Sequence, residues 1–187
     1  MKKITAILLF LICSTAAYSQ YRGYDEWVAS VGINILDNSA FRDPIKGSER
    51  WNFKNPITVG VEYKFDDNWA INPMLSFNGI ERAYEKGVGW IEGDETYMSF
   101  DVNGKFYFGH YIWDNENINL YSGLGLGVFD VGPETNGSIN FNIGMRFWFT
   151  PEFGARIQSL SKFAFDANDH IYANNNFIHS LEFLYRF

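Results

Sequence analysis

Apolar residues recur at every second position over segments of about ten residues, and this period constrains the fold more than any other feature of the sequence. Residues 27–35 have apolar side chains at the odd positions and mostly small or polar ones at the even positions. A period of two is typical of a strand with two chemically different faces. The same period returns seven times, at residues 57–65, 69–78, 98–108, 120–128, 139–149, 153–158 and 181–187. The sequence therefore predicts an all-β fold of about eight antiparallel strands.

The connections between these segments alternate in length. Short turns at one end and long loops at the other are typical of an up-and-down barrel in the outer membrane. Strands of about ten residues, tilted by about 40°, span the thin apolar band of such barrels, about 25 Å tall. The predicted short connections are 66–68, 109–117 and 150–151, and the predicted long ones are 37–55, 79–96, 130–137 and 160–176.

The chemistry of the two faces decides which one points outward. A soluble barrel would turn its apolar face inward around a ligand and its charged face to water. The apolar face of the segments carries no Asp, Glu, Lys or Arg. Its many aromatic and branched side chains exceed the room inside an eight-stranded barrel, which ordinary side chains already fill. We therefore predict a transmembrane barrel whose apolar face meets lipid.

The opposite face combines Gly and Asn with a set of charged residues, four acids and five bases. Buried charges persist when they are paired and hydrogen-bonded, so this near balance predicts a salt-bridge network that plugs the lumen. The predicted interior network consists of Glu62, Lys64, Asp101, Lys105, Arg146, Glu152, Arg156, Glu182 and Arg186.

Aromatic residues gather where the segments meet the short turns. Tyr and Trp favour membrane interfaces, so these residues predict a girdle at the periplasmic edge of the bilayer. Its members are Trp27, Tyr63, Phe65, Trp69, Phe106, Phe108, Phe147, Phe149, Phe153, Tyr185 and Phe187.

Pro73 interrupts the pattern, since it falls inside a segment that otherwise reads as a central strand. Proline donates no backbone hydrogen bond, and a closed barrel has no edge where that loss is harmless. We predict a local bulge at this position.

The N-terminus has the form of a secretory signal. Lys2 and Lys3 precede the apolar run 4–13, and small residues lead to Ser19. The predicted domains are a signal peptide at residues 1–19 and a barrel domain at residues 20–187, with a cut after Gln20 left open. Removal of the signal removes Cys13, the one cysteine, so we expect neither disulfides nor thiolate chemistry.

Composition narrows the functional classes. The formal net charge of −7 opposes nucleic-acid binding, which depends on dense basic patches. The three histidines His110, His170 and His179 lie in different segments without metal-ligand spacing, and the neighbours His179 and Ser180 would point to opposite faces. We expect no metal, no cofactor and no catalytic residues.

The chain resembles the OmpA/OmpX-type family of small outer-membrane barrels. The residues that carry the resemblance are the run Tyr121-Ser122-Gly123-Leu124-Gly125-Leu126-Gly127 and the alternating segment 181–187 with its terminal Phe187. The resemblance implies location in the cell outer membrane. It also implies that Tyr185 and Phe187 belong to a C-terminal signal that the barrel-assembly machinery reads during insertion.

These observations favour a non-enzymatic structural or surface-interaction protein that acts through its long extracellular loops. The expected partners are outer-membrane lipid, lipopolysaccharide and a protein bound at the loops. The loop 37–55 carries the basic residues Arg42, Lys46, Arg50 and Lys54 beside Trp51, a set suited to lipopolysaccharide phosphates. Two alternatives stay open, a narrow transport pore for small solutes and a lipid-modifying barrel enzyme.

Overall fold

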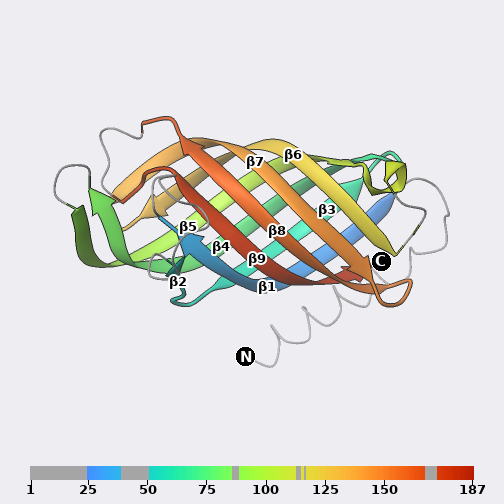
Figure 1. The fold of residues 1–187 in the computed structure, drawn as a ribbon, viewed down its shortest axis with the longest axis horizontal. Coiled ribbons are helices and arrows are strands. Elements are labelled where there is room, and N and C mark those ends of the chain that lie inside the picture. The colour runs from blue at the N-terminus through green and yellow to red at the C-terminus, as the bar shows by residue number, and fades with distance from the viewer. Residues whose placement is uncertain (1–24, 39–50, 86–88, 113–114, 116, 167–171) are drawn as a thin grey trace, which may run out of the picture.

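The chain folds into one antiparallel sheet that curls round to meet itself (Figure 1). The computed structural model describes residues 25–38, 51–85, 89–112, 115, 117–166 and 172–187. A short 3₁₀ turn, Gly109–Tyr111, is followed by β6. None of the helical segments within the described residues is long and apolar enough to cross a membrane. The strands are β1 (Glu26–Asp37), β2 (Trp51–Asn52), β3 (Ile57–Lys64), β4 (Trp69–Glu85), β5 (Gly89–Tyr107), β6 (Ile118–Val131), β7 (Glu134–Trp148), β8 (Phe153–Ala164) and β9 (Asn176–Arg186).

Eight of the described strands close the barrel. From β3 to β9 each strand pairs with the next in sequence, and β1 pairs with both β3 and β9. The closing ladder runs from Val28 opposite Arg186 to Asp37 opposite Phe177. The short β2 pairs only with the end of β1, at Leu36 and Asp37. This topology confirms the predicted eight-stranded up-and-down barrel, and closure pairs each of its eight strands on both sides.

The alternating pattern separates an outer from an inner face. In β7 the side chains of Ile139 and Phe141 are 49% and 42% exposed, whereas those of Asn140 and Asn142 are buried. The other barrel strands repeat this arrangement, with large apolar side chains outside. A soluble monomer rarely exposes so continuous an apolar surface, so the outer face is suited to lipid.

Aromatic rings cover the outside of the short-turn end, as predicted. The rings of Trp27 and Tyr63 lie 4.6 Å apart between centroids, and those of Trp69 and Phe106 lie 4.9 Å apart. Phe149, in the β7–β8 turn, is 69% exposed. The rings thus form contacts between neighbouring strands while their outer surfaces stay open, as an interface girdle requires.

The bulge predicted at Pro73 is wrong. Pro73 lies opposite Val102 in an unshifted β4–β5 ladder, and the β3–β4 ladder keeps one register on both sides of the proline. The side-chain Nδ2 of Asn72 donates to the Val61 carbonyl at 2.8 Å. The neighbouring amide therefore supplies a donor to β3 where proline has none, so the strand needs no extra residue.

Two of the predicted long loops are strands instead. β4 and β5 continue through most of 79–96 and form a hairpin that reaches beyond its neighbours, at the left of Figure 1, with a register shift near Ile80. β6 and β7 leave only residues 132–133 between them, and Gly132 has a φ of 57°. Glycine adopts this left-handed conformation without strain, which permits the tight turn. The predicted loops 37–55 and 160–176 fall partly outside the described residues.

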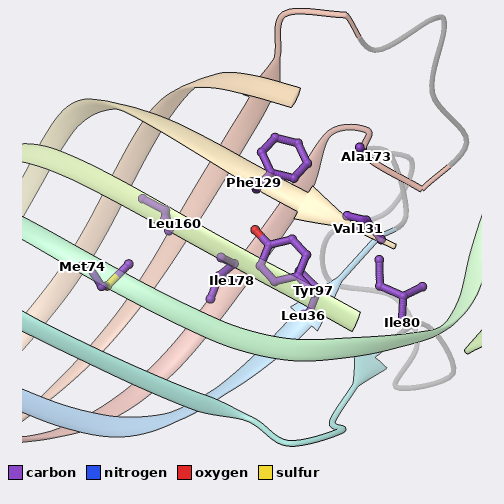
Figure 2. Packing of buried hydrophobic residues seen from close by; sticks show 9 residues of the cluster. All are labelled: Leu36, Met74, Ile80, Tyr97, Phe129, Val131, Leu160, Ala173 and Ile178. Atoms are coloured by element: carbon purple, nitrogen blue, oxygen red, sulfur yellow. The ribbon is translucent and has the colours of Figure 1, made fainter. Parts of the chain in front are cut away.

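An apolar cluster fills the lumen near the long-loop end, whereas the predicted inner face is mostly small, polar and charged. Its side chains come from β1, β4, β5, β6, β8, β9 and the segment just before β9, and they point toward one another inside the barrel (Figure 2). Each is at most 1% exposed. This apolar lumen cluster consists of Leu36, Met74, Ile80, Tyr97, Phe129, Val131, Leu160, Ala173 and Ile178.

Candidate functional site in the barrel lumen

Glu62 is the centre of an ion-pair network inside the barrel. It lies on β3 at an inward position, and only 1% of the residue is exposed. Lys105 Nζ and Arg156 Nη1 lie 2.9 and 2.8 Å from its Oε2. The Tyr107 hydroxyl donates to its Oε1 at 2.5 Å, and Arg146 Nη1 lies 3.3 Å from the same oxygen. One carboxylate therefore joins β3 to β5, β7 and β8 across the lumen.

Glu182, on β9, extends this network. Arg156 Nη2 lies 2.5 Å from Glu182 Oε2, so the Arg156 guanidinium bridges two carboxylates. Gln158 Nε2 and the Ser180 hydroxyl donate to Glu182 Oε1 at 2.9 and 2.7 Å. Because charge-assisted bonds occupy both oxygens, this buried carboxylate is stabilised as an ion.

A second ion pair lies closer to the apolar lumen cluster. Lys162 Nζ on β8 pairs with Asp101 Oδ1 on β5, and both side chains are fully buried. Asn140 Nδ2 and the Ser99 hydroxyl donate to Asp101 at 2.7 and 2.9 Å. Lys162 Nζ also lies 5.0 Å from the centre of the Phe129 ring, which belongs to the apolar lumen cluster. The charged and apolar layers thus adjoin.

The structure places most of the predicted network residues together, but not all. Lys64 and Arg186 lie half-buried at the short-turn mouth of the lumen. Glu152 is exposed in the β7–β8 turn, where its neighbour is Thr150, so the expectation that it lies in the interior is corrected. The residues buried in the lumen as predicted are Glu62, Asp101, Lys105, Arg146, Arg156 and Glu182.

Sequence reasoning missed Lys162 and Glu26. Lys162 continues the inward positions of Arg156 and Gln158, and it lies beyond residue 158, where the predicted alternating segment ends. Glu26 precedes the first clearly apolar residue of β1, and its Oε1 lies 2.9 Å from Arg146 Nη1. Extending each alternating segment by a few residues would have found both.

The three buried carboxylates of this site are all paired with cations. Glu62, Asp101 and Glu182 all accept from cations, so none is a free general base of the kind that catalysis needs. His179 lies on the outer face, whereas Ser180 points inward, and His110 is exposed. The third histidine, His170, lies outside the described residues. Within the described part of the chain, no group of three or more His, Cys, Asp or Glu could hold a metal ion.

The glycine run of β6 leaves room for the network. A Cβ at Gly127 would overlap Asp101 Oδ1 and approach Lys162 Nζ at 3.0 Å. We expect Gly127→Ala to destabilise the folded barrel by about 1–3 kcal/mol, because overpacking displaces a buried ion pair. The midpoint of urea unfolding of the refolded protein measures the loss.

Gly104→Ala is the matched control for that substitution. A Cβ at Gly104 meets its nearest neighbour, the Leu124 carbonyl, at an ordinary 3.6 Å. We expect this variant to unfold at the wild-type midpoint or slightly above it, since alanine restricts the unfolded chain. Equal losses in the two variants would show that Gly127 is not a packing constraint.

A closed barrel with a lipid-compatible exterior, an aromatic girdle and a charged, filled lumen defines the class of small outer-membrane barrels. Residues 5–187 match the family described as "Outer membrane protein beta-barrel domain", and the chain belongs to this family. The family places the protein in the outer membrane. Comparison with curated proteins finds no match.

Solved structures share the fold at low sequence identity. The chain is similar to neisserial surface protein A, with a TM-score of 0.56 and 13% identity over 88% of this chain and 98% of that one. It is also similar to the attachment invasion locus protein Ail of Yersinia pestis in complex with the heparin analogue sucrose octasulfate, with a TM-score of 0.53 and 19% identity over 88% of this chain and 100% of that one. The outer membrane protein AlkL gives a TM-score of 0.53 and 15% identity over 90% and 94%. These likenesses concern the fold.

Proposed function

We propose that this protein is a non-enzymatic outer-membrane anchor that presents its long-loop end for contact with lipopolysaccharide or a partner protein, and that its lumen does not conduct. One observation carries the proposal. Near the long-loop end the two faces of β4, β5 and β6 exchange their chemistry, so that an apolar side chain points inward and a polar one points outward.

Neighbouring residues on three strands show this exchange. Ile80 on β4 and Tyr97 on β5 are each 1% exposed inside the barrel, next to the exposed outward residues Glu81 and Thr96. On β6 the buried Val131 follows the half-buried, outward-facing Asp130. An apolar interior with a polar exterior is typical of a barrel in water. The ends of β4, β5 and β6 that carry Glu81, Thr96 and Asp130 therefore fit a folded surface outside the lipid, which we call the platform.

The interior of the barrel supports a closed lumen. The Glu62 network crosses it in one layer, and the apolar lumen cluster crosses it in another. An eight-stranded barrel has an interior only wide enough for side chains to fill. The transport alternative would need a water path past both layers.

The segment between β1 and β3 adds contact groups to the platform. Trp51 and Phe53 are 46% and 57% exposed, and large exposed aromatic side chains are enriched at interaction surfaces. Lys54 forms an ion pair with Asp94, which ties this segment to the β4–β5 hairpin. Partners would thus meet an ordered surface at low entropic cost.

Site-specific photocrosslinking in native outer membranes tests the proposal. A benzoylphenylalanine at Glu81 on the platform should yield discrete adducts with lipopolysaccharide or with one protein. The same probe at Asp67 is the matched control, because Asp67 is an exposed acid in the β3–β4 turn at the other end. Absence of adducts at Glu81, or the same adducts at both positions, would contradict the proposal.

A further inference from the structure

The short-turn mouth of the lumen contains a polar cavity that the proposed function does not use. Its volume is about 620 Å³. The strands β1, β3, β7 and β9 contribute charged side chains to its wall, and exposed turn residues such as Asp66 form its rim. Its wall includes Glu26, Lys64, Arg146, Trp148 and Arg186.

Stacked rings hold the guanidinium groups of this cavity in place. The Trp148 ring has Arg186 Cζ 3.9 Å and Arg146 Cζ 4.9 Å from its centre. Arg146 also lies 4.6 Å from the centre of the Tyr107 ring. Cation–π contacts of this kind fix the planes of both guanidiniums, so their donors are oriented before any ligand arrives.

The charges in this half of the lumen do not balance. Five basic side chains, Lys64, Lys105, Arg146, Arg156 and Arg186, share three carboxylates, Glu26, Glu62 and Glu182. The exposed acids Asp66, Asp67 and Glu152 reduce this excess across solvent. The excess belongs to the half-buried Lys64 and Arg186 at the mouth, and positive charge at the mouth favours an anion.

Donors without acceptors line the same wall. Arg146 Nε, Trp148 Nε1 and Arg186 Nε are buried and make no hydrogen bond. Arg146 itself is only 2% exposed. Arg186 Nε lies 3.5 Å from Glu26 Oε2, which is an ion pair without hydrogen-bond geometry. All three groups can only donate hydrogen bonds, so a ligand that satisfies them must supply acceptor atoms such as oxygen.

We propose that this cavity binds a ligand through an oxyanion group, phosphate or carboxylate, which enters at the short-turn end and accepts from Trp148 and the Arg146–Arg186 pair. Guanidinium groups match both oxyanions geometrically. This proposal is independent of the proposed function at the opposite end.

Titration of the mature protein with inorganic phosphate or with acetate, followed by NMR in dodecyl maltoside, tests the proposal. This detergent carries neither charge nor phosphate. The indole N–H signal of Trp148, assigned by its absence in Trp148→Phe, should shift saturably with at least one of the two anions, and chloride at equal ionic strength should leave it in place. Saturation by phosphate alone, by acetate alone or by both identifies the oxyanion class.

Arg186→Gln should weaken the apparent affinity about tenfold, because one oriented charged donor is lost. Lys54→Gln is the matched control, since it removes one positive charge at the other end of the barrel, and it should keep the wild-type affinity. Arg186→Lys keeps the charge without the guanidinium fork and should bind more weakly than wild type. A signal that does not saturate with either anion, or equal affinities in the wild type, Arg186→Gln and Lys54→Gln, would overturn the proposal.

Discussion

Replacing Glu62 with alanine is expected to destabilise the folded barrel by about 3–5 kcal/mol, the largest effect among single substitutions in the lumen. Lys105, Arg146 and Arg156 would lose their shared carboxylate while they remain buried. Unpaired buried cations cost far more than the ion pairs themselves contribute. The urea midpoint of the protein refolded in lipid vesicles measures the loss, and gel migration with and without heating reports the folded fraction.

Glu152→Ala is the matched control, because it removes a carboxylate that the alternating pattern also assigns to the interior. Glu152 is exposed in the β7–β8 turn. Surface substitutions of this kind change stability by less than about 0.5 kcal/mol. Similar midpoints for the two variants would mean that the Glu62 network does not hold the barrel together.

The second large effect is expected on the outer face. Phe141→Arg should destabilise the inserted barrel by about 2–4 kcal/mol, since Phe141 is the central residue of β7 and its side chain would meet the middle of the bilayer. Phe149→Arg should cost only about 0–1 kcal/mol, because Phe149 lies in the turn at the girdle, where a charge reaches water. Unfolding in vesicles compares the two variants.

The difference between the destabilisation free energies of these two variants distinguishes a membrane barrel from a soluble one. In water, both exposed positions would accept arginine with little cost. A cost at Phe141 no larger than that at Phe149 would therefore contradict the placement of β7 across the bilayer.

The sequence predicts the membrane-spanning part of the fold well, for a physical reason. Lipid outside and a narrow filled lumen inside impose opposite chemistry on alternate residues, and that contrast is visible in residues such as Ile139 and Asn140. The inward position of Gly123, Gly125 and Gly127 follows from the same contrast, since a Cβ at each would meet inner side chains or the neighbouring strand.

The contrast disappears where the strands leave the lipid, and there the predictions fail. Leu160 is buried between Ser159 and Ser161, so an apolar residue occupies the inner position and the sign of the pattern reverses. The same reversal hides the continuation of β4 and β5, where the sequence predicts a loop. Lys162 was missed because it lies beyond residue 158, where the predicted segment ends, although Lys162 inside and Phe163 outside resume the ordinary pattern.

Side-chain contacts between strands account for the remaining gaps. The compensation of Pro73 depends on the Asn72 amide reaching the Val61 carbonyl, which alternation alone does not show. The stacking of Trp148 between Arg146 and Arg186 joins β7 to β9. The sequence shows which residues of a strand face inward, but which inner side chains pair with one another depends on the register of the closed barrel.

A closed lumen leaves the protein to act at its ends. Planar-bilayer recording of the mature wild-type protein measures whether the lumen conducts, with a general porin as the positive control for the assay. We expect no discrete conductance steps, because the Glu62 network and the apolar lumen cluster fill the interior. Stepwise ion conductance in the wild type, unchanged when Glu62→Gln or Arg156→Gln neutralises the network, would contradict the closed lumen.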